Sequence, residues 1–389
     1  MLINYAKQTI EQDDIDSVLE VLSSDWLTQG PKIKEFEKSL KKKFNSKYCT
    51  VVSSGTAALH LAGRALGWKK GDIIITSPLT FAATGNSVLY SSAAVDFVDI
   101  DQSNNIDVEK VEKKIEFYKK KSKKIKAIIG VDYAGHPCNW KRLRELADYY
   151  KIKLINDNCH AMGAKYKNEY DYAIKYADIV THSYHPAKNI TTGEGGAILT
   201  NEEEFHEKIQ RLRSHGIYKK KKYDSKDKGS WFYEINELGF NYRITDFQSA
   251  LGINQLKKLD KFIKRRREIA NIYNDKFGKN KNFIIPYNSK EVYHAYHLYP
   301  LQAKFDKKNK NKKLFFEKMK KFNLNFMVHY VPLHLQPLYK KKFNFKKGDF
   351  PLSEQFYKQV FSIPIFPKLT NDNINFISSK ILQYFENKK

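Results

Sequence analysis

Apolar residues recur at helical spacing near the start of the chain. Ile15, Leu19 and Leu22 are three or four positions apart, which is typical of an amphipathic helix. Pro31 then stands where a first-turn proline belongs. The apolar residues after it keep the same spacing: Ile33, Phe36, Leu40 and Phe44. We therefore predict two helices before residue 45.

From residue 48 the pattern changes to short β-branched runs that alternate with helical ones. The predicted strands cover 48–52, 73–75, 95–98, 127–131, 153–155, 179–182 and 197–199. The predicted helices cover 56–66, 81–89, 108–117 and 143–150. Such alternation indicates an α/β fold with a mostly parallel sheet and helices on both faces. Ligands of such sheets bind where strands end and loops begin.

The last third of the chain has a different pattern. A long helix is predicted over 245–277, followed by a mixed segment with elements at 296–301, 314–322 and 374–385. We interpret this part as a smaller α+β domain.

Composition is typical of a globular protein of a reducing compartment. The 389 residues are 41% hydrophobic, and no apolar stretch approaches the roughly 18 residues that a membrane span needs. The start of the chain lacks the apolar core of a signal peptide. Cys49, Cys138 and Cys159 are odd in number and far apart, so we expect no disulfide framework and no metal site. A cytoplasmic location is expected.

The net charge of +26 raises the question of nucleic acid binding. The excess lies in lysine runs at 119–121, 219–222, 307–313 and 340–342, with asparagine between them rather than arginine or paired aromatic residues. No zinc finger or aromatic RNA-binding signature is present. We expect these runs to be solvated loops, and we expect neither nucleic acid nor membrane as a partner. The alternative, a basic nucleic-acid-binding protein, predicts steeply salt-dependent affinity.

Two of the predicted strands end in segments with candidate chemistry. Residues 53–59, Ser-Ser-Gly-Thr-Ala-Ala-Leu, join a strand to a helix whose free N–H groups can bind an anion, most simply phosphate. The same residues also suit an ordinary helix cap. Asp157 follows the strand at 153–155, and either caps a helix or serves a cationic ligand.

The most informative segment runs from His182 to Gly196 and contains Lys188 among small and apolar residues. A lysine in such surroundings can have a lowered pKa and act as a nucleophile toward carbonyl groups. The HxxH spacings at 182/185 and 294/297 lack the glutamate of the HExxH motif, so we do not expect a metal there.

These segments, in this order, resemble the DegT/StrS family of sugar aminotransferases. The resemblance extends to Gly239-Phe240-Asn241-Tyr242-Arg243 and to the Gln-Ser-Ala-Leu-Gly string at 248–252, and it covers essentially the whole chain. It implies a fold-type-I enzyme dependent on pyridoxal 5′-phosphate (PLP), with a seven-stranded, mostly parallel sheet. The large domain, with its N-terminal helical arm, would span 1–250, and the small α+β domain would span 251–389. It also implies a homodimer with shared active sites.

The resemblance implies a role for each matching residue. Lys188 would hold PLP covalently and shuttle a proton, while Asp157 would pair with the pyridine nitrogen. Phe81 would stack on one face of the ring, and Cys159, where many relatives carry Ala or Ser, would lie at the other. The phosphate would be held by Gly55, Thr56 and Ser183, with Asn241 from the second subunit, and His160 would contact the oxygen side of the cofactor.

Within the family, the chain is most similar to members acting in pseudaminic acid biosynthesis. Strings such as Val131-Asp132-Tyr133-Ala134-Gly135 carry that similarity. It implies transfer of an amino group from L-glutamate to C4 of a UDP-linked 4-keto-6-deoxy-N-acetylhexose. The implied substrate-binding residues are Tyr5, Asp25, Trp26, Leu27, Thr28, Val328, His329, Tyr330 and Val331. The alternatives are a different UDP- or dTDP-keto sugar, and a dehydratase with His in place of the lysine, against which Lys188 argues.

Overall fold

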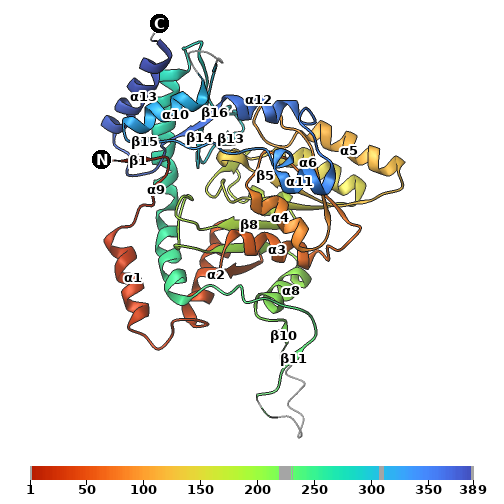
Figure 1. Cartoon of the computed structure of the whole chain (residues 1–389). Coiled ribbons are helices and arrows are strands. Elements are labelled where there is room, and N and C mark those ends of the chain that lie inside the picture. Colours follow the sequence, from red (N-terminus) through yellow and green to blue (C-terminus); the bar gives the residue numbers. More distant parts are fainter. Residues whose placement is uncertain (1, 219–228, 230, 306–310, 387–389) are drawn as a thin grey trace.

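A seven-stranded sheet forms the centre of the computed structural model, which describes residues 2–218, 229, 231–305 and 311–386 (Figure 1). The spatial order of its strands is β2 (Tyr48–Val52), β9 (Gly196–Thr200), β8 (Ile179–Ser183), β6 (Lys153–Asp157), β5 (Ile125–Val131), β3 (Ile73–Thr76) and β4 (Ala94–Phe97). The five strands from β8 to β4 pair in parallel, and β9 is antiparallel to both of its neighbours. The predicted fold class, a mostly parallel seven-stranded α/β sheet, is confirmed.

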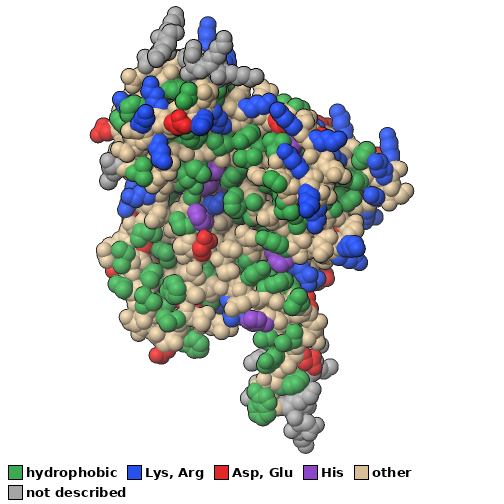
Figure 2. Space-filling model, viewed as in Figure 1, with side chains coloured by type: hydrophobic (Ala, Val, Ile, Leu, Met, Phe, Trp, Pro, Cys, Tyr) green, Lys and Arg blue, Asp and Glu red, His purple; other side chains and the backbone are tan. Residues whose placement is uncertain are grey.

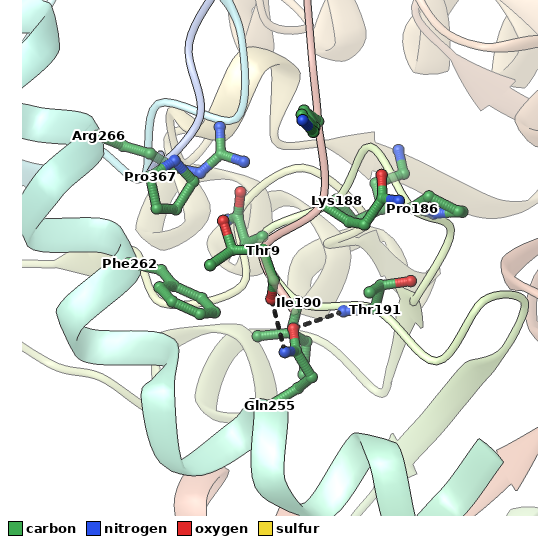
Figure 3. Close-up of a pocket in the computed structure, with 12 residues that line it drawn as sticks. Thr9, Pro186, Lys188, Ile190, Thr191, Gln255, Phe262, Arg266 and Pro367 are labelled. Carbon is green, nitrogen blue, oxygen red and sulfur yellow. Dashed lines mark hydrogen bonds between the residues drawn. The ribbon is translucent and has the colours of Figure 1, made fainter. Parts of the chain in front are cut away.

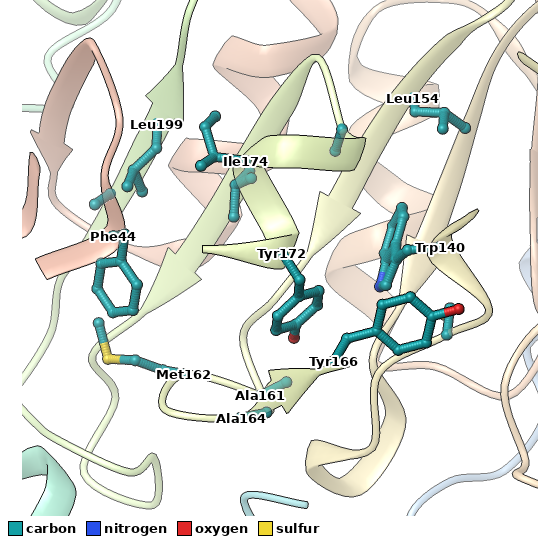
Figure 4. Close-up of a cluster of buried hydrophobic side chains, with 14 of the residues drawn as sticks. Phe44, Trp140, Leu154, Ala161, Met162, Ala164, Tyr166, Tyr172, Ile174 and Leu199 are labelled. Carbon is teal, nitrogen blue, oxygen red and sulfur yellow. The ribbon is translucent and has the colours of Figure 1, made fainter. Parts of the chain in front are cut away.

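Two hydrophobic cores cover the two faces of this sheet. Side chains alternate along each strand, so Leu154 belongs to one core and Ile155 to the other. Figure 4 shows the first core, where Trp140 and Phe44 lie with Leu154 and Leu199 from the strands. Its helices are α2 (Pro31–Phe44), α5 (Val108–Lys120), α6 (Trp140–Tyr150) and the first half of α9 (Asp246–Phe277). The second core contains α3 (Gly55–Ala65) and α8 (Glu203–Arg213), with Val88 from α4 (Ala82–Tyr90).

The C-terminal third builds a separate core around a small antiparallel sheet. Its strands are ordered β12 (Phe283–Ile284), β14 (Tyr299–Ala303) and β16 (Val360–Ile363), and they pack with α10 (Lys312–Lys321) and α13 (Asn371–Glu386). The second half of α9 supplies Ile269, Tyr273 and Phe277 to this core. The predicted domain boundary at 250/251 therefore falls inside one continuous helix, and the domain division stays a prediction.

The N-terminal arm crosses both parts of the molecule. Strand β1 (Ile3–Asn4) pairs in parallel with β15 (Leu324–Asn325) of the C-terminal part. Helix α1 (Gln12–Leu22) packs against the first half of α9 through Lys258, whose ammonium lies 2.9 Å from the buried Asp14 carboxylate. Between these two elements the arm passes alongside the segment that contains Lys188, because Thr9 and Lys188 line the same pocket.

The remaining elements are short. They are β7 (Lys165–Tyr166), α7 (Tyr172–Tyr176), β10 (Ile217–Tyr218), β11 (Glu234–Ile235), β13 (Val292–Tyr293), α11 (Pro337–Phe343) and α12 (Pro351–Gln359), with 3-10 turns at Tyr133–Gly135 and Leu333–Leu335. Strands β10 and β11 pair as a hairpin that extends away from the body of the molecule (Figure 1).

The lysine runs at 119–121 and 340–342 are exposed, but they are not in loops as we predicted. Lys119 and Lys120 form the last turn of α5, and Lys340–Lys342 lie in the last turn of α11. A helix C-terminus attracts cations, which explains why lysines suit these positions. The run at 219–222 and most of the run at 307–313 lie outside the described residues. Figure 2 shows Lys and Arg side chains scattered over many elements on the face that it displays.

Within residues 2–218, 229, 231–305 and 311–386, no helix is long and apolar enough to cross a membrane.

Candidate active site

The parallel strands β3, β6 and β8 end at the same edge of the sheet. The segments at their ends carry predicted site residues. Asp157 is the last residue of β6 and is 5% exposed. Its Oδ2 accepts a hydrogen bond from Thr84 Oγ1 at 2.7 Å, and its Oδ1 accepts one from the Cys159 N–H at 3.3 Å. These two donors fix the orientation of the carboxylate. The lone pairs of Asp157 that they leave free can accept a hydrogen bond from a ligand.

An anion cradle is formed where β2 leads into α3. Ser54 caps the helix by accepting a hydrogen bond from the Ala57 N–H at 3.0 Å. The N–H groups of Gly55 and Thr56, at the first two positions, have no partner inside the helix. A Cβ added at Gly55 would lie 2.7 Å from Ser183 Cβ, so only glycine lets the end of β8 approach the helix start. The Ser183 side chain therefore lies directly beside these N–H groups.

Lys188 lies on the loop between β8 and β9, as the sequence predicted. Its side chain is partly buried, and no carboxylate of the described residues is within ion-pair distance of its amine. Desolvation by burial lowers its pKa, although the nearby Asp157 carboxylate opposes that shift. A larger fraction of the amine is therefore neutral and nucleophilic than for a lysine in water.

Contacts from the N-terminal arm and α9 fix the loop that carries Lys188. Gln255 accepts a hydrogen bond from the Thr191 N–H at 3.4 Å and donates one to the Thr9 carbonyl at 2.9 Å. Figure 3 shows these bonds beside a small pocket that Lys188 shares with Thr9, Phe262 and Arg266. The pocket includes Lys188 but none of the other predicted site residues. We interpret it as part of the support of the loop.

A buried carboxylate, that of Asp132, accepts hydrogen bonds that fix the loop after β6. Asp132 is fully buried, and its Oδ2 accepts hydrogen bonds from Asn158 Nδ2 at 3.0 Å and from the Tyr172 hydroxyl at 2.7 Å. Its Oδ1 accepts one from Trp140 Nε1 at 2.8 Å. This network orients the two residues that follow Asn158, which are Cys159 and His160.

Cys159 and His160 both lie near enough to Lys188 for its charge to affect their pKa values. Burial and the Asp157 carboxylate raise the pKa of the Cys159 thiol well above its usual value, so the thiol stays protonated. Burial, with a smaller contribution from the Lys188 ammonium, lowers the pKa of His160 well below its usual value, so the ring stays neutral. Its Nδ1 accepts a hydrogen bond from the Ala134 N–H at 3.3 Å, and its Nε2 lies 3.0 Å from the Tyr330 hydroxyl.

The segment 328–331 reaches this edge of the sheet from the C-terminal part. Tyr133 donates a hydrogen bond from its hydroxyl to the His329 carbonyl, and His329 Nδ1 lies 2.8 Å from Ser362 Oγ on β16. The Tyr5 and His329 rings are 5.0 Å apart. The Tyr330 ring lies 5.8 Å from the ring of Phe81, which is 56% exposed. Val328 is half-buried and Val331 is exposed on the same segment.

Some predicted site residues lie apart from this group within the chain. Asn241 is exposed, and its recorded backbone partner is Ser214 near the β10–β11 hairpin. Asp25, Trp26, Leu27 and Thr28 are all exposed on the turn between α1 and α2. That turn contacts the start of α9, where the Leu27 carbonyl accepts the Asp246 N–H at 3.0 Å. Within the described residues of one chain, no contact places Asn241 or residues 25–28 beside Lys188.

Three residues of the site were missed by sequence reasoning. Thr84 follows Phe81 by three positions and so lies one helical turn further along α4, a spacing that could have indicated it. Tyr133 and His297 gave no such signal for this site. The His297 ring lies 4.4 Å from His160, and Tyr133 holds the backbone of His329, both across more than a hundred residues of sequence.

Comparisons with known proteins agree with this geometry. Residues 8–382 match the model of the DegT/DnrJ/EryC1/StrS aminotransferase family. An uncharacterised protein of Methanocaldococcus jannaschii is 45% identical over 94% of this chain and 93% of its own length. The UDP-4-amino-4,6-dideoxy-N-acetyl-beta-L-altrosamine transaminase of Campylobacter jejuni is 39% identical over 100% of this chain and 99% of its own. The solved structure of PseC from Helicobacter pylori, an aminotransferase of pseudaminic acid biosynthesis, matches with a TM-score of 0.91 at 32% identity, over 99% of this chain and all of that one.

Proposed function

Because the chain belongs to the DegT/DnrJ/EryC1/StrS aminotransferase family and is a sugar aminotransferase, we propose that it moves an amino group from L-glutamate to C4 of a UDP-linked 4-keto-6-deoxy-N-acetylhexose. The product would be UDP-4-amino-4,6-dideoxy-N-acetyl-beta-L-altrosamine, a precursor of pseudaminic acid. The observation that carries this substrate is similarity along the whole chain to relatives that bear that name, at 39%, 38% and 33% identity. We propose the cytoplasm as its location.

Aminotransferases of this family depend on PLP, and the residues at the sheet edge fit that cofactor. The glycine cradle at the start of α3 presents two N–H groups that have no partner inside the helix, beside the Ser183 side chain, which suits a phosphate. Asp157 is a fixed, buried carboxylate that suits a protonated ring nitrogen. Lys188 is a partly buried amine with a lowered pKa, which suits a covalent bond to an aldehyde. The fit supports PLP as the cofactor of this chain.

Each of these residues has a distinct proposed task. Bound PLP supplies an electron sink for the carbanion that forms when a proton leaves the donor's α-carbon. Asp157 would keep the ring nitrogen protonated, and Gly55, Thr56 and Ser183 would hold the phosphate. The Lys188 amine would anchor the cofactor and then carry the proton between the α-carbon and the cofactor's C4′.

The walls of the site have proposed tasks as well. Phe81, with its exposed ring, would stack on one face of the cofactor, and Cys159 would lie at the other. Because its thiol stays protonated, Cys159 would add bulk and polarisability there without a second negative charge. His160 would lie on the oxygen side of the cofactor, and the segment 328–331, with Tyr5, would face the sugar.

We also propose that the enzyme is a homodimer with shared active sites. One apolar patch covers α1 and the turn after it, where Ile15, Leu19, Leu22, Trp26 and Leu27 are exposed. A second lies around β11, where Trp231, Tyr233, Ile235 and Leu238 are exposed. Exposed apolar residues gathered in this way are typical of protein interfaces. Asn241 follows the second patch, so its proposed phosphate contact would be made in the partner's site.

Product analysis tests the proposed reaction. The purified enzyme is incubated with PLP, glutamate and a panel of UDP- and dTDP-linked keto sugars, and the products are identified by NMR. We expect the 4-amino product with the β-L-altro configuration from the UDP-4-keto-6-deoxy-N-acetyl substrate. Preferential amination of a dTDP sugar or of a 3-keto sugar would contradict the proposed substrate.

A further inference from the structure

The hydroxyl of Tyr330 stands at the end of a hydrogen-bond chain whose direction can be worked out. Ala134 donates its backbone N–H to His160 Nδ1 at 3.3 Å, so that nitrogen is an acceptor and carries no proton. His160 is buried, and its lowered pKa keeps the ring neutral. A neutral imidazole with a bare Nδ1 carries its single proton on Nε2.

This tautomer determines what the Tyr330 hydroxyl can do. His160 Nε2 lies 3.0 Å from the Tyr330 oxygen, so the ring donates its proton to that oxygen. The hydrogen of Tyr330 must then point away from His160, since a single hydrogen bond needs only one proton. Among the described residues no acceptor is recorded for it. Burial raises the pKa of Tyr330, so the hydroxyl keeps its proton.

Tyr330 lies next to residues that we predict to line the active site. Its ring lies next to Phe81, and the Asp157 carboxylate is near enough to contribute to its raised pKa. The backbone is also fixed, because the neighbouring His329 is held by Tyr133 and by Ser362. Tyr330 is therefore a positioned donor at the site, and it is poorly suited to act as a base.

We propose that Tyr330 donates a hydrogen bond to the carbonyl oxygen of the keto sugar, and that His160 acts as a positioning residue through Tyr330. The inference rests on the proposed function. It assigns recognition of the sugar's carbonyl oxygen to the Tyr330 hydroxyl, acting as the hydrogen-bond donor. A single neutral O–H suits a carbonyl, whereas a carboxylate such as those of glutamate favours a charged partner. The bond would draw electron density toward the carbonyl oxygen as the amine nitrogen attacks the carbon, and the proton would stay on Tyr330.

The two half-reactions separate this role from a structural one. In the Tyr330→Phe holoenzyme, cofactor absorbance is followed first with glutamate alone and then with the UDP-4-keto sugar alone. We expect an unchanged glutamate half-reaction and a keto-sugar half-reaction slower by about tenfold or more. In the Lys188→Ala background, which cannot turn over, Tyr330→Phe should raise the Kd of the keto sugar about tenfold and leave the Kd of UDP unchanged.

A matched pair of variants tests the part assigned to His160. In His160→Gln the side-chain amide nitrogen can take the place of Nε2 and still donate to Tyr330, whereas the shorter side chain of His160→Asn cannot. We expect the rate of the keto-sugar half-reaction, relative to that of the glutamate half-reaction, to fall in His160→Asn as it does in Tyr330→Phe, and to be kept in His160→Gln. Equal slowing of both half-reactions in Tyr330→Phe, or no change in either, would overturn the inference. Failure of the unmodified enzyme with every UDP-4-keto sugar would instead overturn the proposed function, and the inference with it.

Discussion

Lys188 and Asp157, the two residues at the centre of the proposed chemistry, owe their properties to burial at the ends of strands. Burial lowers the pKa of the Lys188 amine, while two hydrogen-bond donors compensate the buried Asp157 carboxylate. Their positions were predictable, because each lies in a segment that follows a strand-like run in the sequence. Their supports were not, because Gln255 and Thr9 meet the Lys188 loop across more than sixty residues of sequence and leave no periodic signal.

A substitution pair at Asp157 tests the proposed electron-sink role. Asp157→Asn removes the charge opposite the ring nitrogen and should lower kcat by about 10²–10³. Thr84→Val removes the hydrogen bond to Asp157 Oδ2, together with the one that Thr84 accepts from the Thr80 hydroxyl, and should lower kcat about tenfold. Ser87→Ala is the control, since Ser87 is equally buried on α4 but its hydroxyl bonds only the Thr84 carbonyl. Steady-state kinetics that rank Asp157→Asn with Ser87→Ala would contradict the assigned role.

At the scale of elements, helix α9 connects the two cores of the chain and positions the N-terminal arm. Its first half packs under the large sheet and its second half packs in the C-terminal core. The long helix and the alternation of strands and helices along the chain in the large domain were predicted from periodicity. Helices α8, α11 and α12 and the two-residue strands were not predicted. A two-residue strand has no period to detect, and α8 buries only Ile209 and Leu212 among charged residues.

The Lys258 cluster should account for much of the attachment of α1 to α9. Lys258 is 11% exposed and contacts Glu11, Asp13 and the fully buried Asp14. Lys258→Met keeps the length of the side chain but leaves the Asp14 carboxylate without its cation, which should cost about 2–4 kcal/mol of unfolding free energy. Urea unfolding measures that cost. Lys261→Met, which removes a largely exposed lysine that contacts only Glu11, should cost less than about 1 kcal/mol.

At the scale of the whole molecule, buried neutral histidines make stability depend on pH. Burial lowers the pKa of His60 and His136 to about 4, and of His182 and His329 to about 3. Their pKa values are depressed in the folded state, so below the usual value of 6.5 only the unfolded chain binds these protons. Stability should therefore be complete above pH 6.5 and fall as the pH drops toward 4, by at most about 1.4 kcal/mol per pH unit for each histidine.

His182→Phe provides the direct check of this pH dependence. His182 packs edge-on against Phe44, and its Nδ1 is buried without a hydrogen-bond partner, so phenylalanine can occupy the site. Urea midpoints measured between pH 7.5 and pH 4.5 should fall less steeply in the variant than in the unmodified protein. Parallel curves for the two proteins would show that His182 does not contribute.

Subunit mixing tests whether the active sites are shared in the proposed dimer. Lys188→Ala and Asn241→Ala should each be nearly inactive alone. If Asn241 acts in the partner's site, a refolded equal mixture should recover about a quarter of the unmodified activity, since half the dimers are mixed and each has one intact site. Absence of recovery, with mixed dimers shown by mass spectrometry, would place both residues in the same subunit's site.

The lysine that binds the cofactor is the most direct test of the account. The purified protein is loaded with PLP, reduced with borohydride and digested, and the modified peptide is identified by mass spectrometry. We predict a single pyridoxyl label on Lys188, together with loss of the label in Lys188→Ala. A label on another of the many lysines, or no label on a folded protein, would contradict the proposed site and the function that depends on it.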